Sequence, residues 1–277
     1  MTDLPPAAPP TGAPPALPGR FVSLEGGDFA GKTTQQRLLG AWLRGLGHEV
    51  VLTREPGGTP LGQVLRDAVL HGGDVDPRTE ALLYATDRAH HVHRLVLPAL
   101  ARGAVVVTDR YLDSSVAYQG AARELGGAEI RALSLWATEG LLPHLTVLLD
   151  LDPGVAAARR TGAPDRIERE SAAFHTRVRE HFLALAAAEP GRYLVLDAAR
   201  PAEEIHAAIR QRLAPLLPAG ADAVGPSPDP VKATPAPPDA APPAVPAPPD
   251  AAPPAVPAPP GPAPAPAPDG ARTSVQR

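Results

Sequence analysis

Between residues 20 and 213, short apolar runs alternate with longer amphipathic stretches. The runs Phe21–Leu24, Ala104–Thr108 and Leu145–Leu149 are almost uninterrupted, as is typical of strands buried on both faces of a sheet. Glu49–Thr53 and Tyr193–Leu196 are less continuous but also favour strands. The pattern therefore predicts five strands in this part of the chain.

Helical periodicity fills the intervals between the predicted strands. In the first interval, apolar residues recur at helical spacing from Leu38 to Leu46, and Gly47 stands where a helix C-cap is expected. Asp76 and Pro77 form a helix-start signal before a long helix that reaches Val92. A further helix is predicted over residues 61–70, and two more lie between residues 111 and 144. One helix ends at residue 188, and the last one begins at residue 201.

Strands that alternate with helices predict an α/β fold, in which a five-stranded parallel sheet carries helices on both faces. Ligands of such folds bind beyond the carboxyl ends of the strands. Four charged residues stand at those ends, namely Glu25, Arg54, Asp109 and Asp150.

The segment after the first predicted strand has the P-loop pattern G-x-x-x-x-G-K-T. In such a loop, backbone N–H groups surround phosphate oxygens at the N-terminus of the following helix. Lys32 would reach the β- and γ-phosphates, and the Thr33 hydroxyl would bind Mg²⁺. The pattern thus predicts an ATP site made of Gly26, Gly27, Asp28, Phe29, Ala30, Gly31, Lys32 and Thr33.

Proline sets the expected domain boundaries. Of the 38 prolines, 22 lie in residues 214–277 and 7 in residues 1–19. The C-terminal segment also repeats the sequence APPDAAPPAVP, at 236–246 and again at 247–257. Chains of this composition bury too little apolar surface to fold. We therefore expect one P-loop domain over residues 20–213, between a disordered extension (1–19) and a disordered tail (214–277).

Charge and composition narrow the function classes. The net charge is only −4, without a basic stripe, so binding to nucleic acid is not expected. There is no cysteine, which excludes disulfides and thiolate chemistry. No apolar run approaches the length of a membrane span, and no signal peptide is recognisable at the N-terminus. A cytoplasmic protein without membrane contact is expected.

The absence of asparagine argues against a GTPase, which usually recognises guanine through an N-K-x-D motif. A motor or transporter ATPase would normally need a longer chain, which leaves a small phosphotransferase with a second, acceptor site. Three segments after the P-loop carry arginines, whose positive charges could bind two anionic substrates.

Several motifs together resemble the bacterial thymidylate kinases, a family of P-loop nucleoside monophosphate kinases. The motifs are LEGGDFAGKTTQ, TREPGGTPLGQVLR, LLYATDRAHHV, DRYLDSSVAYQG and DRIERE, in the family's order and spacing. The resemblance implies a P-loop fold with a mobile lid, a homodimer, and transfer of a phosphoryl group from ATP to dTMP with Mg²⁺.

The resemblance also implies which residues bind dTMP. Tyr84, where the family more often has Phe, would stack on thymine, and Arg88 would bind a thymine carbonyl. The alternative for this pair, four residues apart on one helix, is a simple surface contact. The implied dTMP site consists of Glu55, Arg66, Tyr84, Arg88, Arg110, Ser115 and Gln119.

Three acids match family positions. Asp109 resembles a Walker B acid that supports Mg²⁺ through water, and the alternative is a strand-end carboxylate paired with a neighbouring arginine. Asp28 matches an acid beside the acceptor phosphate, where it would orient the metal or hold the acceptor. Glu55 would line the acceptor pocket and support Ser115.

The arginine that stabilises the transition state is expected in the lid segment. In one branch of the family the P-loop carries this arginine, at the position of Phe29 here. The segment after the fourth predicted strand offers Arg159, Arg160 and Arg166, with Arg159 or Arg166 preferred. The alternatives are that these arginines are only solvated, or that Arg110 supplies the charge.

Two features support other interpretations. His90, His91 and His93 suggest a metal site, but a surface position on the long helix, at the dimer contact, is preferred. The proline-rich tail could bind aromatic-groove modules, although a solvated tail without a known partner is preferred. The rival functions are therefore another nucleoside or nucleotide kinase, and an interaction protein that acts through its tail.

Overall fold

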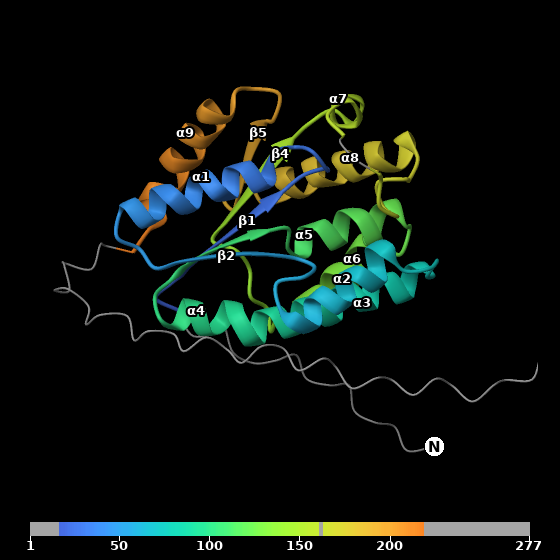
Figure 1. The fold of residues 1–277 in the computed structure, drawn as a ribbon, viewed down its shortest axis with the longest axis horizontal. Coiled ribbons are helices and arrows are strands. Elements are labelled where there is room, and N and C mark those ends of the chain that lie inside the picture. Colours follow the sequence, from blue (N-terminus) through green and yellow to red (C-terminus); the bar gives the residue numbers. More distant parts are fainter. Residues whose placement is uncertain (1–16, 161–162, 219–277) are drawn as a thin grey trace, which may run out of the picture. The chain divides into compact units, whose positions relative to one another are not determined.

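The computed structural model describes residues 17–160 and 163–218. A five-stranded sheet forms the middle layer of this part of the chain (Figure 1). Its strands are β1 (Arg20–Glu25), β2 (Val50–Arg54), β3 (Val105–Asp109), β4 (Leu145–Asp150) and β5 (Tyr193–Asp197). They follow the order β2-β3-β1-β4-β5, and every neighbouring pair is parallel. The predicted fold class is confirmed, and no strand end differs from its predicted position by more than one residue.

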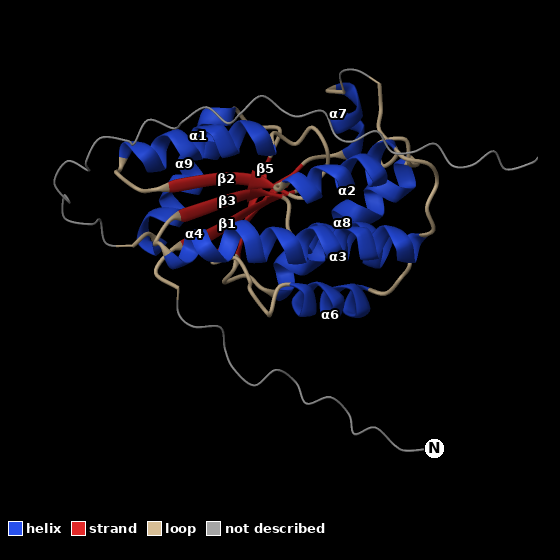
Figure 2. Cartoon of the chain, turned by 60° about the horizontal axis from the view of Figure 1, so that its bottom comes forward, coloured by secondary structure: helices blue, strands red, loops and turns tan. Residues whose placement is uncertain are grey.

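Helices cover both faces of the sheet (Figure 2). On one face lie α1 (Lys32–Gly45) and α9 (Ala202–Leu213), which pack on the side chains of Val22, Val107 and Val147. The other face carries α3 (Pro77–His91), the π-helical turn η1 (Val92–Val96), α4 (Leu97–Ala101), α6 (Gly127–Ala137) and α8 (Ala172–Ala188). The alternation of side chains along each strand produces these two cores.

The remaining helices lie near the carboxyl ends of the strands or close the chain. They are α2 (Pro60–His71), α5 (Leu112–Ser115), the π-helical turn η2 (Val116–Ala122), α7 (Pro153–Ala158) and the 3₁₀ turn η3 (Ala214–Leu216). Thr59 and Asp76 cap α2 and α3, each followed by proline at the start of the helix.

The folded core extends slightly beyond the predicted domain. Leu17 packs on the α3–α6 side, and Leu217 packs on the α1–α9 side. The rest of the two predicted terminal extensions, residues 1–16 and 219–277, lies outside the described residues. Among the helices that the structure describes, none is long and apolar enough to span a bilayer.

Candidate active site

A cavity of about 740 Å³ opens at the carboxyl ends of β1, β2 and β3. Its lining includes most of the predicted site residues, from segments far apart in the sequence. These are Asp28, Phe29, Gly31, Lys32, Thr33, Glu55, Arg66, Tyr84, Arg88, Asp109, Arg110, Ser115, Gln119 and Arg159. Gly26 and Gly27 line a smaller neighbouring cavity, Ala30 is buried in the core, and Arg166 does not line the large cavity.

The P-loop takes a conformation that depends on its glycines. Gly26 has φ 130°, and a Cβ atom there would run into the backbone carbonyl of Leu149 on β4. Gly31 has φ 94° and leads directly into α1. These positive φ angles favour glycine because it has no Cβ. The loop thus wraps around the N-terminus of α1, the arrangement that binds phosphate in other P-loops.

Lys32 is buried at the start of α1, and its Nζ donates to the carbonyls of Gly27 at 2.7 Å and Gly26 at 3.2 Å. Burial lowers the pKa of this amine, and the nearby Arg110 charge lowers it further. Asp109 and Asp28 act in the opposite direction. The ammonium group is therefore held against the loop by two backbone oxygens, and the charges of Asp109 and Asp28 favour its protonated form.

Thr33 and Asp109 lie together at the mouth of the cavity. The Thr33 hydroxyl donates to Asp109 Oδ2 at 3.0 Å. Among the described residues Asp109 forms no ion pair with arginine, although one was the alternative to a metal role. Two oxygen donors side by side, next to a phosphate-binding loop, fit the preference of Mg²⁺.

Asp28 and Arg110 connect the P-loop with the segment after β3. Arg110 Nη2 lies 2.6 Å from Asp28 Oδ1, while Nη1 donates to Gly26 O and to Ser114 Oγ. Arg110 also lies over the Tyr118 ring, 5.1 Å from its centroid. Burial works against ionisation of Asp28, but the Arg110 and Lys32 charges outweigh it and lower the Asp28 pKa. Both charges are thus held in place.

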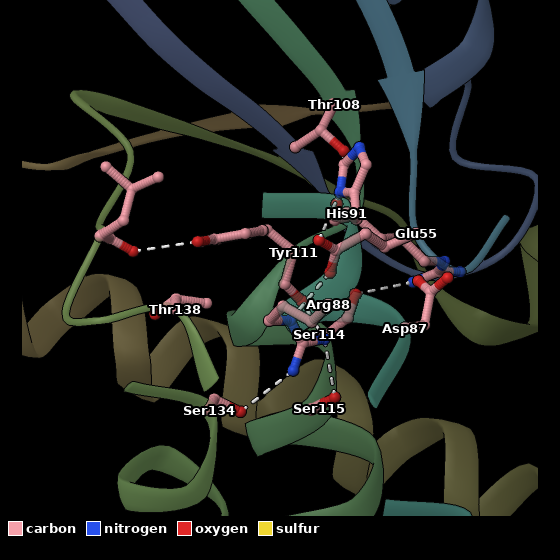
Figure 3. A network of polar contacts seen from close by, with 12 residues as sticks. Glu55, Asp87, Arg88, His91, Thr108, Tyr111, Ser114, Ser115, Ser134 and Thr138 are labelled. Carbon is pink, nitrogen blue, oxygen red and sulfur yellow. Dashed lines mark hydrogen bonds and ion pairs between the residues drawn. The ribbon is translucent and has the colours of Figure 1, made fainter. Parts of the chain in front are cut away.

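Arg88 is the most deeply buried cation of the cavity wall, with 2% of its surface exposed. Its Nε lies 2.8 Å from Glu55 Oε2, and its Nη groups donate to Ser134, Ser115 and the Tyr111 carbonyl (Figure 3). Glu55 therefore supports Ser115 through Arg88, which bonds to both. Because these contacts fix the plane of the guanidinium, the N–H group that has no partner points in one set direction.

The prediction for His91 was wrong. Instead of lying on the surface, His91 is fully buried, with Nδ1 at 2.8 Å from Glu55 Oε1 and Nε2 at 2.7 Å from Thr53 Oγ1. It follows Arg88 by three residues and so shares its helix face. Within the described residues there is no cluster of three or more metal-ligating side chains of His, Asp or Glu.

The other acceptor-site residues come from α2, α3 and η2. Arg66 donates to the Pro56 carbonyl at 3.0 Å, and burial lowers its pKa, with Arg54 adding to the effect. Burial raises the pKa of Tyr84, so its hydroxyl stays neutral. Gln119 donates through Nε2 to Glu80 Oε1 at 2.8 Å.

The arginines of the lid segment take different positions. Arg159 donates to the Ala198 carbonyl at 3.1 Å and lines the large cavity, as Lys32 does. Arg160 is exposed and donates to the Glu168 carbonyl. Arg166 pairs with Glu80 at 2.6 Å and donates to the Val69 carbonyl. Of the two preferred candidates, Arg159 is the one that faces the cavity.

Several residues of the site were not predicted. Tyr118 and Ser114 line the cavity, and both bond to Arg110. Both residues belong to the same DRYLDSSVAYQG motif as Arg110, which was a signal in the sequence. Glu80 gave no comparable signal. An acid in the first turn of a helix is common, because it interacts favourably with the helix dipole, so its presence there does not indicate a role in the site.

Comparisons with known proteins agree with this geometry. Residues 24–209 match the family model described as Thymidylate kinase. The chain belongs to the thymidylate kinase family. It is 63% identical to a thymidylate kinase of Clavibacter michiganensis subsp. michiganensis over 211 residues, which are 75% of this chain and all of the relative.

More distant relatives bear the same name. A thymidylate kinase of Deinococcus radiodurans is 53% identical over 194 residues, 69% of this chain and 94% of the relative. A thymidylate kinase of Cutibacterium acnes is 54% identical over 201 residues, 72% and 98% of the two chains. The family resemblance inferred from the motifs is confirmed.

Glu25, at the end of β1, provides a test of the site's electrostatics. It is fully buried, and it accepts hydrogen bonds from Tyr111 N at 2.8 Å and Ser114 Oγ at 2.6 Å. Burial, together with the nearby Asp113 charge, raises its pKa from 4.5 to about 8. The folded protein therefore keeps a proton that the unfolded chain releases near pH 4.5.

A raised pKa in the folded state stabilises the protein at low pH, and this contribution is lost as pH rises through about 8. The Glu25→Gln variant mimics the protonated form at every pH. We expect its free energy of unfolding, relative to that of the wild type, to increase by about 1–3 kcal/mol as pH is raised from 6 to 8. Guanidinium unfolding at both pH values measures the difference. Glu203→Gln, at an exposed position on α9, is the control, and a constant difference for Glu25→Gln would contradict the expectation.

Proposed function

We propose that the protein transfers the γ-phosphoryl group of ATP to the phosphate of dTMP. One observation carries this proposal: the P-loop and the predicted nucleotide-acceptor residues line the same cavity. Phosphoryl transfer needs two anionic groups brought together in line, with their charge compensated. The site residues, placed at the edge of the sheet, could both align the two anionic groups and compensate their charge. The relatives bear the name of this reaction.

On the donor side, the P-loop N–H groups and Lys32 would bind the ATP phosphates. Lys32 Nζ is held by the Gly26 and Gly27 carbonyls, beside the N-terminus of α1. Thr33 and Asp109 would hold Mg²⁺, which, when bound, neutralises charge on the phosphates. The Arg159 guanidinium, on the same cavity wall, stabilises the charge that develops during transfer.

On the acceptor side, Arg110 and Arg66 would bind the dTMP phosphate. Asp28 holds Arg110 at 2.6 Å and thereby sets its position next to the P-loop. Tyr84 and Arg88, on one face of α3, would bind the base together with Ser115 and Gln119 from the α5–η2 segment. No residue forms a covalent intermediate, because positioning and charge stabilisation are sufficient for this transfer.

The expected homodimer has a candidate surface. Leu82 on α3 is 56% exposed and Trp136 on α6 is 79% exposed, and the two helices pack against each other. Large apolar side chains that gather on one surface are typical of contact sites. We propose that this surface joins two copies of the chain in the cytoplasm, where ATP and nucleotides are present. A monomeric mass in light scattering at micromolar concentration would contradict this.

The substrate prediction is tested with an ADP-release assay on dTMP, dUMP, dCMP and thymidine. We expect dTMP to be used best and dUMP less well, because one methyl group in an apolar pocket contributes about 1–3 kcal/mol. Lys32→Ala is the control, expected to lose nearly all turnover while still binding dTMP. Equal use of dTMP and dCMP, or activity on thymidine alone, would contradict the proposal.

The lid arginines are tested by single Arg→Ala variants at positions 159, 160 and 166. Because Arg159 faces the cavity, we expect its loss to lower kcat by on the order of 10³-fold, with smaller changes in both KM values. Arg160, which lines the smaller cavity and not the large one, is the matched control, with an expected change below about tenfold in kcat. Near-normal kcat in all three variants would indicate that Arg110 supplies the charge instead.

A further inference from the structure

Glu80, in the first turn of α3, gathers side chains from two other parts of the fold. Its carboxylate is 1% exposed and accepts from Gln119 Nε2 at 2.8 Å and from Arg123 Nη2 at 3.2 Å. Arg166 Nη2, from the DRIE segment, lies 2.6 Å away. Two guanidinium groups thus compensate the buried negative charge, which would otherwise be costly.

Glu80 stands in line with the acceptor-site residues of α3. Glu80, Tyr84 and Arg88 are separated by four residues each and therefore share one face of the helix. Tyr84, Arg88 and Gln119 line the cavity, but Glu80 does not. Glu80 therefore lies behind the cavity wall and can act on a ligand only through a residue that it holds.

The residue that it holds is Gln119. An ion-paired carboxylate only accepts hydrogen bonds, whereas an amide has an NH₂ donor at one corner and an oxygen acceptor at the other. Gln119 must therefore turn its NH₂ group to Glu80, as observed. Its carbonyl oxygen is turned away, and it receives no hydrogen bond from the residues that the structure describes.

We propose that Glu80 is a positioning residue that makes Gln119 present its carbonyl oxygen to the pyrimidine base. This orientation selects a base whose ring nitrogen carries a hydrogen between two carbonyl groups, as in thymine and uracil. Cytosine has a bare acceptor nitrogen at that place, so two acceptors would face each other. Leaving buried acceptors unpaired is what allows a polar site to reject an analogue.

The inference rests on the proposed function and adds a specificity determinant to it. The variant that tests it is Glu80→Gln, because a glutamine at position 80 can donate as well as accept. Its own NH₂ group can bind the Gln119 oxygen, which lets the Gln119 amide turn around and offer NH₂ to the base. The shape of residue 80 changes little, so packing of α3 is preserved.

The substrates are dTMP and 5-methyl-dCMP, which share the methyl group and differ at the exocyclic C4 group and at the ring nitrogen. We expect the ratio of their kcat/KM values to fall at least about tenfold in Glu80→Gln, mainly through KM. Arg88 is unchanged in this variant, so the shift in the ratio reports the orientation of Gln119. A role of Glu80 in stability alone would lower both kcat/KM values equally.

Arg123→Gln is the matched control. It also removes an ion pair from Glu80, but it leaves the Gln119–Glu80 hydrogen bond in place. We expect this variant to lose thermal stability as Glu80→Gln does, while its substrate ratio stays within about twofold of the wild-type value. An equal change of the ratio in both variants would overturn the proposal.

A second variant, Gln119→Leu, covers the case in which Glu80→Gln does not fold. It removes the amide and leaves the Glu80 ion pairs with Arg123 and Arg166 intact. The proposal requires its substrate ratio to fall by a similar factor, and an unchanged ratio would overturn it. A wild-type protein inactive on dTMP would instead contradict the proposed function, before any variant is compared.

Discussion

Compensation of buried charge is the constraint on which the site depends. Arg88, Glu55 and Glu80 are each at most 3% exposed, and an isolated charge at such a place would be strongly destabilising. Arg88 is therefore paired with Glu55, and Glu80 with Arg166, so that each buried charge is compensated and fixed in place. The result is a cavity wall whose hydrogen-bond donors are oriented before any substrate arrives, which is how enzymes avoid reorganisation during the reaction.

The sheet determines where these charges can meet. Because β1 lies between β3 and β4, the P-loop emerges at the centre of the parallel sheet. The segment that follows β3 ends beside it, which brings Arg110 to Asp28 although 82 residues separate them in the sequence. The apolar runs that form the buried parallel strands thus also determine the chemistry of the site, because they bring the polar residues at the carboxyl ends of the strands to one edge of the sheet.

The sequence was most informative where a function needs a local pattern. The P-loop requires its glycines and Lys32 at set spacing, so the donor half could be predicted, and alternating elements predicted the sheet. His91 and Glu80 could not be placed, because their roles depend on partners far away. Glu80 meets Gln119, Arg123 and Arg166 across 39, 43 and 86 residues. A single acid or histidine on an amphipathic helix does not indicate such partners.

The π-helical turn η2 fixes the helical phase of Gln119 in the acceptor half, and η1 fixes that of α4 relative to α3. η1 follows directly after His91, and η2 contains Gln119. A π turn holds one residue more than the α-helical turn it replaces, and each residue of an α-helix accounts for about 100° of rotation. Removing one residue from either turn would give a more regular helix while redirecting every side chain beyond it. In these segments, insertions and deletions would therefore be less tolerated than substitutions, so the spacing of residues would change more slowly than their identity.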